Sequence, residues 1–439
     1  MLVPLAAATA DLCGGKAAAL GALIRANLPV PEGVVVPFPT HDAHPLLARR
    51  VARGEHRPPK VLTEDLSRLE SVELTEELGR WLDSVGDPVV AVRSSAANED
   101  TASASAAGQH DSFLGVQGVA AVEAAVRACW ASLWSDRATA YRDASGGDAS
   151  MAVIVQRQVD SEVSGVMFTP ADATGTTVIE ASWGLGPSVV EGRVTPDRYW
   201  VTADGSVTRT IADKPTSLDR HGSHAVPTSR RTQATLTDAT ATRLAQLGQE
   251  VTAVLGNAQD IEWALTADHL WLLQSRPITA QPPTASPSSA GQPAASSLRS
   301  GVPASVGQAA ASGLRSGVPG SAGQPVVGGL RGRVLTGAPA SHGTASGPVR
   351  IVLGPADFGR VRPGDILVCR FTDPAWTPLL GIAAGVITET GGILSHAAIV
   401  ARERGIPAIV AVPNATTDLP NDTPITMNGS TGTIHRPEG

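Results

Sequence analysis

A single histidine stands between a Gly-Gly pair and a helical pattern in the run TETGGILSHAAIVARERGIPAIV, residues Thr388–Val410. Gly391 and Gly392 permit a tight turn, and residues 397–404 are predicted to form a short amphipathic helix. His396 then falls at the N-terminus of that helix, where free amide groups and the helix dipole favour an anion. An imidazole with an ordinary pKa near ~6.5 is a competent nucleophile at neutral pH. We therefore interpret His396 as a nucleophile that carries a phosphoryl group.

An isolated histidine in an alanine-rich segment is more often a helix cap or a core residue, but the surrounding residues favour the functional interpretation. The run resembles the phosphohistidine signature of the phosphoenolpyruvate-utilising family, which includes pyruvate phosphate dikinase, phosphoenolpyruvate synthase and rifampin phosphotransferase. The resemblance continues in three upstream segments, GAPASHGTASGPVRIV (337–352), PGDILV (363–368) and TDPAWTP (372–378). It implies that His396 is phosphorylated. The sequence departs from the family at Ala411, where members usually have glycine, and we expect this change to affect the following turn.

Near the start of the chain, CGGKAAALG combines backbone freedom with a positive charge. Gly14 and Gly15 permit close approach of the backbone to an anion, although their spacing is not that of a Walker loop. Lys16 is one of three lysines in the sequence, with Lys60 and Lys214. Because an ammonium is a compact point charge, it suits a tight phosphate contact. We favour that role for Lys16 over a surface position, which we expect for Lys60.

A second candidate phosphate site follows in AVRSSAANEDTASASAAGQHDSFLGV, residues 91–116. The pattern predicts a strand that ends in Arg93 and a loop of small residues after it. The guanidinium suits a phosphate, and the loop suits a lid over phosphates. An ordinary surface loop is the alternative.

The third candidate site is DIEWALTADHLWLLQSRPIT, residues 260–279, which is predicted to form two strands joined by a turn at Thr266–Asp268. Residues two apart in a strand share a face. Four polar side chains should therefore point the same way: Asp260, Glu262, Gln274 and Arg276. Two carboxylates, an amide and a guanidinium suit Mg²⁺ and a triphosphate. A structural ion-pair network is the alternative.

These three segments, in this order, resemble the ATP-grasp nucleotide-binding domain of the same family. The likeness continues through residues 129–142, 151–169 and 179–197. It implies that Lys16 and Arg93 bind the phosphates of ATP, that Glu262 and Gln274 hold Mg²⁺, and that Asp260 and Arg276 complete the site. The strand from Gln156 to Val159 resembles the adenine-contacting hinge, with Gln158 where relatives commonly have methionine.

The chain is thus predicted to be an α/β protein with an ATP-grasp domain at 1–279 and a small α/β swivelling phosphohistidine domain at 328–439. Strands are expected at Val89–Val92 and Met151–Val155, and a helix at Val122–Trp134. Residues 280–327 consist mainly of Ala, Ser, Gly, Pro and Gln, which predicts a flexible linker. Its expected span of ~35–40 Å would let the His domain travel between separate sites.

Composition excludes several classes of protein. A formal net charge of −7 argues against a nucleic-acid-binding surface. Three widely spaced cysteines suit a reducing cytoplasm and offer neither a disulfide framework nor a zinc site. No apolar run approaches the ~20 residues that span a bilayer, and the N-terminus lacks the basic lead-in of a signal peptide. We expect a cytoplasmic enzyme.

The resemblance implies that His396 takes the β-phosphoryl of ATP, releases AMP and loses the γ-phosphoryl as inorganic phosphate. The acceptor is open, because no segment resembles the barrel or helical acceptor domains of the family. One hypothesis is a phosphotransferase whose small-molecule acceptor (a specialised metabolite, an amino acid or an antibiotic) binds between the domains. Another is a phosphocarrier subunit that delivers to a separate partner polypeptide. A regulatory ATP-binding module without turnover is the third.

Overall fold

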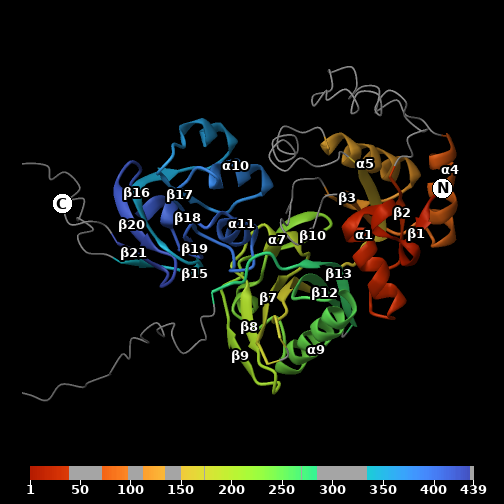
Figure 1. Ribbon diagram of the computed structural model, residues 1–439, viewed down its shortest axis with the longest axis horizontal. Coiled ribbons are helices and arrows are strands. Elements are labelled where there is room, and N and C mark those ends of the chain that lie inside the picture. Colours follow the sequence, from red (N-terminus) through yellow and green to blue (C-terminus); the bar gives the residue numbers. More distant parts are fainter. Residues whose placement is uncertain are drawn as a thin grey trace, which may run out of the picture.

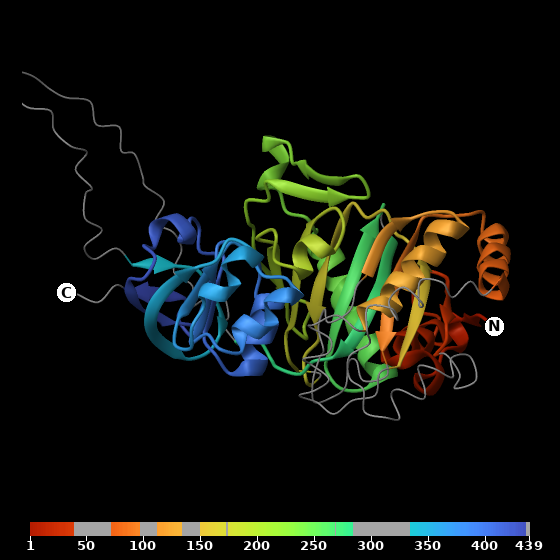
Figure 2. The ribbon, with the colours of Figure 1, turned by 90° about the horizontal axis from the view of Figure 1, so that it is seen from above.

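The computed structural model describes residues 1–38, 72–96, 112–133, 150–172, 174–267, 269–283 and 334–435 of the 439-residue chain. Three large β-sheets lie in a row within these residues, with a six-stranded sheet between the other two (Figures 1 and 2). We refer to the described residues up to 283 as the N-terminal unit and to residues 334–435 as the C-terminal unit. Most of the predicted linker and the predicted small-residue lid at 97–111 lie outside the described residues.

The first sheet is antiparallel and has the strand order β1, β2, β5, β3, β4. Its strands are β1 (Val3–Pro4), β2 (Gly33–Val36), β3 (Val90–Ala96), β4 (Ser112–Val116) and β5 (Met151–Arg157). Its helices are η1 (Leu5–Ala7), α1 (Ala10–Arg25), α4 (Val72–Ser84) and α5 (Val119–Ser132). Side chains alternate across a strand, so Val153 and Val155 pack with α4 and α5 while Ala152 and Ile154 pack with α1.

The middle sheet is also antiparallel and has the order β13, β12, β6, β7, β8, β9. Its strands are β6 (Val163–Phe168), β7 (Thr177–Trp183), β8 (Asp197–Val201), β9 (Val207–Thr210), β12 (Gln259–Thr266) and β13 (His269–Pro277). The smaller elements nearby are α7 (Pro187–Val190), α8 (Thr228–Arg231) and the hairpin of β10 (Thr216–Asp219) and β11 (Gly222–Ala225). Met167 and Ile179 face a core shared with α9 (Asp238–Leu255), whereas Val166 and Phe168 face the C-terminal unit.

The C-terminal unit contains an eight-stranded sheet in the order β14, β21, β20, β16, β17, β18, β19, β15. The strands are β14 (Leu335–Thr336), β15 (Ala338–Ser341), β16 (Thr344–Ile351), β17 (Ile366–Cys369), β18 (Gly385–Thr388), β19 (Ala408–Val410), β20 (Pro424–Asn428) and β21 (Thr433–His435). The helices are η3 (Pro355–Arg360), η4 (Pro374–Trp376), α10 (Thr377–Leu380), α11 (His396–Arg404) and α12 (Ala415–Asp418). Strands β16 to β19 are parallel neighbours, and α10 and α11 pack beside them.

Most predicted elements form, with shifted ends. The helix expected at 122–134 is α5, and the helix expected at 397–404 is α11, which begins one residue earlier at His396. One prediction is wrong: the strand β3 does not end in Arg93 but continues to Ala96, because Ser94, Ser95 and Ala96 pair with β5. The described helices include none that is both long enough and apolar enough to cross a membrane.

Candidate active site

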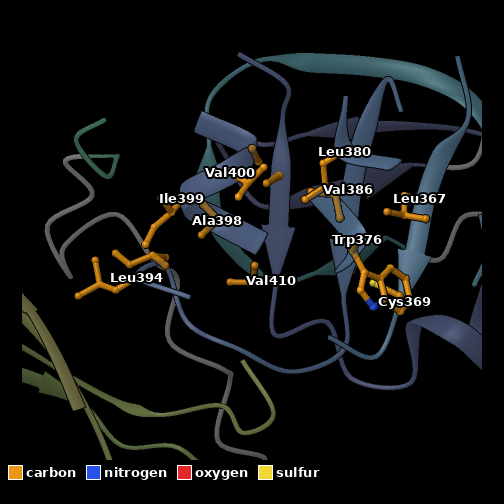
Figure 3. Close-up of a cluster of buried hydrophobic side chains, with 14 of the residues drawn as sticks. Leu367, Cys369, Trp376, Leu380, Val386, Leu394, Ala398, Ile399, Val400 and Val410 are labelled. Carbon is orange, nitrogen blue, oxygen red and sulfur yellow. The ribbon is translucent and has the colours of Figure 1, made fainter. Parts of the chain in front are cut away.

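His396 is the first residue of α11 and is almost fully buried, with 4% of its surface exposed. The helix starts there because Ser395 has extended backbone and because Gly391, at φ +104°, turns the preceding loop. Residues 396–401 of α11 are all buried, so the helix is less amphipathic than predicted. Figure 3 shows why: Ala398, Ile399 and Val400 pack into the core of the C-terminal unit.

Two threonine hydroxyls hold the imidazole ring. Nδ1 of His396 lies 2.9 Å from Oγ1 of Thr372, and Nε2 lies 3.4 Å from Oγ1 of Thr377. When Nδ1 carries the ring proton and donates it to Thr372, the lone pair lies on Nε2, which is then the nitrogen that is available for chemistry. Both threonines belong to the TDPAWTP segment, but nothing in the sequence pattern identified them as partners of His396.

Burial lowers the pKa of His396 to about 4, and the positive charge of Arg276 contributes in the same direction. Both effects disfavour the imidazolium. The ring is therefore neutral at physiological pH and keeps the lone pair that a nucleophile needs. Because Arg276 belongs to β13 of the N-terminal unit, the C-terminal unit sits with its histidine toward the predicted phosphate site.

The hairpin of β12 and β13 brings the four predicted polar residues together. Asp260 pairs in register with Arg276, and Glu262 pairs with Gln274. Arg276 contacts Asp260 through Nε and Nη2, each 2.8 Å from Oδ2. Burial raises the pKa of Asp260, while Arg276 opposes the rise and Glu262 adds to it. The two strands join at Ala267, within the predicted turn; Asp268 lies outside the described residues.

Arg93 links the first sheet to this hairpin. Its Nη1 donates to the carbonyl of Leu273 over 3.0 Å, and its Nη2 lies 3.4 Å from Oε2 of Glu262. Arg93 and Glu262 both line a pocket between the sheets. The predicted adenine hinge contributes Gln156, Gln158 and Val159 to the lining of the same pocket. Predicted phosphate and adenine contacts therefore share one cavity.

The hinge residues use their side chains differently. Gln156 is buried and donates from Nε2 to the carbonyl of Pro31 over 3.0 Å. Gln158 accepts from the amide of Gly115 over 2.6 Å, and its buried Nε2 has no hydrogen-bond partner among the residues that the structure describes. An orphaned buried donor is costly unless a ligand satisfies it. The end of β5 therefore fits a hydrogen-bonding planar ligand such as adenine.

Lys16 lies on α1, half-buried, and is not among the residues that line this pocket. The backbone freedom of Gly14, at φ +78°, serves the packing of α1 against β3. A Cβ there would lie 2.5 Å from the carbonyl oxygen of Ser95, so α1 can approach β3 only at a glycine. Of the other lysines, Lys214 is fully buried against Asp197, 2.5 Å away, and Lys60 lies outside the described residues.

The donor set fits Mg²⁺ bound jointly with phosphates. No group of three or more His, Cys, Asp or Glu side chains within the described part of the chain could hold a metal alone. Glu262 and Gln274, paired across the hairpin, offer one carboxylate and one amide oxygen. Mg²⁺ commonly takes one or two protein oxygens and completes its shell with phosphate and water. These two residues would hold the ion beside the nucleotide.

The two units share a continuous buried core. Val166, Phe168, Val189 and Val194 of the N-terminal unit cluster with the residues around α11. In Figure 3, Leu394 lies on the side of the C-terminal core that faces the strands of the N-terminal unit. Sequence reasoning missed this interface, including Glu180 at its centre, because its contacts join residues about two hundred positions apart.

Comparisons with known proteins show the family to which the chain belongs. The family model "Pyruvate phosphate dikinase, AMP/ATP-binding domain" matches residues 60–294, and "PEP-utilising enzyme, mobile domain" matches residues 361–432. A probable phosphoenolpyruvate synthase of Methanothermobacter thermautotrophicus is 33% identical over 97% of this chain and 61% of its own length. The phosphoenolpyruvate synthase of Aeropyrum pernix is 32% identical over 97% and 56%, and that of Escherichia coli is 33% identical over 79% and 43%. The chain thus spans about half the length of these relatives.

Proposed function

The chain belongs to the family of phosphoenolpyruvate-utilising dikinases, and on that premise we propose that it is an ATP-dependent phosphotransferase that carries its phosphoryl group on His396. One observation supports this most strongly. The buried, neutral imidazole begins α11 and faces the N-terminal unit closely enough for Arg276 to lower its pKa.

The proposed step is an attack by Nε2 of His396 on the β-phosphorus of ATP. A bond forms between Nε2 and Pβ, the bond between Pβ and the oxygen bridging to Pα breaks, and AMP leaves with that oxygen. Water takes the γ-phosphoryl, which leaves as inorganic phosphate. The phosphoryl group left on His396 then passes to the acceptor, and the ring returns to its neutral form.

The remaining residues position and neutralise the reacting phosphates. Arg93 and Lys16 would oppose the negative charge of the triphosphate. Glu262 and Gln274 would hold Mg²⁺, which supplies charge neutralisation when bound. Arg276 is held by Asp260, so its charge is oriented before the nucleotide binds. The half-buried hinge at Gln158 and Val159 would bind adenine.

We propose a small molecule as the acceptor. The candidates are a specialised metabolite, an amino acid and an antibiotic, because no segment of this chain resembles the acceptor barrel of the family members that make phosphoenolpyruvate. The alternative is a carrier that delivers the phosphoryl group to a partner polypeptide. Such a carrier would load His396 in the same way as a phosphotransferase with a small-molecule acceptor, but it would not turn over without its partner.

A quench-flow measurement of AMP from Mg²⁺-ATP, with β-³²P and γ-³²P labels in parallel, tests the proposal. A phosphotransferase with a small-molecule acceptor turns over continuously with one candidate and moves the β label into it. A carrier gives a single burst of AMP and stops until a partner protein is added. Release of ADP, with γ label on the acceptor and none on the protein, would contradict the proposal.

A further inference from the structure

A carboxylate of the N-terminal unit is bound by the loop that carries His396. Glu180 lies on β7 with its side chain fully buried. Its Oε1 accepts from the amide of Ile393 over 2.9 Å, and its Oε2 accepts from the amide of Leu394 over 3.0 Å. These two consecutive amides, here termed the amide pair, lie directly before Ser395 and His396.

The carboxylate is held from its own side as well. Arg198 on β8 places Nε 2.9 Å and Nη2 2.8 Å from Oε1 of Glu180. Oε2 accepts from the amide of Leu394 at the junction of the two units. Charge-assisted hydrogen bonds in a desolvated site are strong, and a buried carboxylate that loses its donors is costly. Separation of the units therefore carries a specific penalty at Glu180.

Glycines on both sides let the two backbones meet around this contact. Thr390 donates from Oγ1 to the carbonyl of Gly192 over 2.7 Å, across the junction. A Cβ on Gly192 would lie 3.3 Å from the Cα of Gly391. A Cβ on Gly392 would lie 1.9 Å from Oε2 of Glu180, which no side chain can accommodate. Gly392 does not have positive φ, so its own backbone conformation does not require glycine. Glycine is required at position 392 because a Cβ would overlap with the docked carboxylate of Glu180.

We propose that Glu180 is the docking residue for the His-carrying loop: its carboxylate binds the amide pair and thereby fixes His396 in the position where it is loaded from ATP. This rests on the proposed function, because loading is the step that docking serves. Glu180 is a positioning residue, since it contacts the loop and not the imidazole. The glycine at 392 is required because the carboxylate needs its space.

The test compares Glu180→Gln, Gly392→Ala and Glu180→Ala with the double variant Glu180→Ala plus Gly392→Ala. Controls are Glu250→Gln, exposed on α9, and Gly359→Ala, where a Cβ meets nothing within 4 Å. Each protein is assayed for ATP affinity, for the rate of His396 phosphorylation at saturating Mg²⁺-ATP, and for its radius of gyration by X-ray scattering.

We expect Glu180→Gln and Gly392→Ala each to lower the loading rate at least about tenfold, the value of one charge-assisted hydrogen bond, while ATP affinity stays within about twofold. The radius of gyration of both variants should increase, because a larger share of the molecules has the two units separated. In the Glu180→Ala background, Gly392→Ala should cost nothing further, because the group that it strikes is gone. A merely structural role would give additive losses and lower ATP affinity.

Failure of the docking role and failure of the proposed function give different results. If the wild type loads His396 and Glu180→Gln loads it equally fast, the docking role is wrong and the proposed function stands. If the wild type does not load at all, the proposed function fails. In that case the radius of gyration still tests the docking role. A Glu180→Gln protein with the same radius of gyration as the wild type would overturn that role.

Discussion

The chemistry of His396 depends on which ring nitrogen is free and whether the ring is protonated. The hydroxyl of Thr372 occupies Nδ1, and burial together with Arg276 keeps the ring neutral. In the tautomer that carries its proton on Nδ1, the lone pair of Nε2 is the nucleophile, and Oγ1 of Thr377 lies 3.4 Å from it. Because Thr372 contacts one ring nitrogen and the other one reacts, the role of Thr372 can be tested by substitution.

Thr372→Val keeps the shape of the side chain and removes the contact to Nδ1. Because the ring is then free to rotate or change tautomer, we expect loading of His396 to slow by about 10–100-fold. ATP affinity should not change. Thr372→Ser retains the hydroxyl and should load nearly as fast as the wild type, as followed by phosphohistidine formation over time. Equal rates for the valine and serine variants would show that the hydroxyl does not position the ring.

Ala411 is held in left-handed backbone at φ +56°, at the position where the family usually has glycine. The sequence predicts an altered turn here, and the structure places the alanine in a region of backbone conformation that is strained for a residue with a Cβ. Left-handed backbone costs a non-glycine residue roughly 1–2 kcal/mol, and glycine loses about 0.4–1 kcal/mol through the unfolded chain. Ala411→Gly should therefore raise the free energy of unfolding by about 0.5–1 kcal/mol in denaturant titrations. Ala408→Gly, on the neighbouring strand, should lower it; a loss of stability in both variants would contradict the argument.

At the scale of elements, the hairpin of β12 and β13 was the most predictable part of the site. The two-residue period placed Asp260 and Glu262 on one face, and the register pairs them with Arg276 and Gln274. The bulge after Glu262 in the pairing with β13 left no signal in the sequence.

Glu262→Gln tests the metal role of this hairpin. The change keeps the volume of the side chain and removes the charge that would attract Mg²⁺. We expect loading to fall about 100-fold, and the gain in ATP affinity that Mg²⁺ provides to shrink. Titration calorimetry with and without Mg²⁺ gives the second readout independently of turnover. An ATP affinity that depends on Mg²⁺ as strongly as in the wild type would exclude Glu262 as a ligand.

Other elements show where sequence reasoning stops. His396 at the start of α11 could be predicted, because glycines, capping and periodicity are local signals. The end of β3 and the packing role of Gly14 could not, since both depend on β5 and Ser95, which are distant in sequence. Glu180 gave no signal at all: its amide partners lie 213 and 214 residues along the chain, and a lone carboxylate in a strand has no local pattern.

At the scale of the whole molecule, the two units are joined by a buried core and by the Glu180 contact. Burial lowers the pKa of His396 to about 4, and Arg276 of the N-terminal unit contributes in the same direction. When the units separate, the contribution of Arg276 is lost, so the pKa of the imidazole rises and the ring takes up a proton more readily as the pH falls. Docking is consequently strongest where the imidazole is neutral in both forms and weakens as the pH falls through the pKa of the separated form toward 4.

This linkage predicts a pH-dependent association of the units. Scattering should show the compact form at pH 7.5 and a larger share of the extended form at pH 5. The shift should be smaller in His396→Asn, which cannot take up the proton, and the difference between the two proteins isolates the histidine from other titrating groups. Identical pH profiles for both proteins would show that His396 does not control docking.

The central claim is that His396 carries a phosphoryl group taken from ATP. Its most direct test is intact-mass spectrometry of the protein incubated with Mg²⁺-ATP at alkaline pH, with the nucleotide products identified in the same sample. We predict one acid-labile phosphoryl adduct accompanied by AMP, and its complete loss in His396→Ala with ATP binding retained. An adduct of the same size in His396→Ala, or ADP in place of AMP, would contradict the claim.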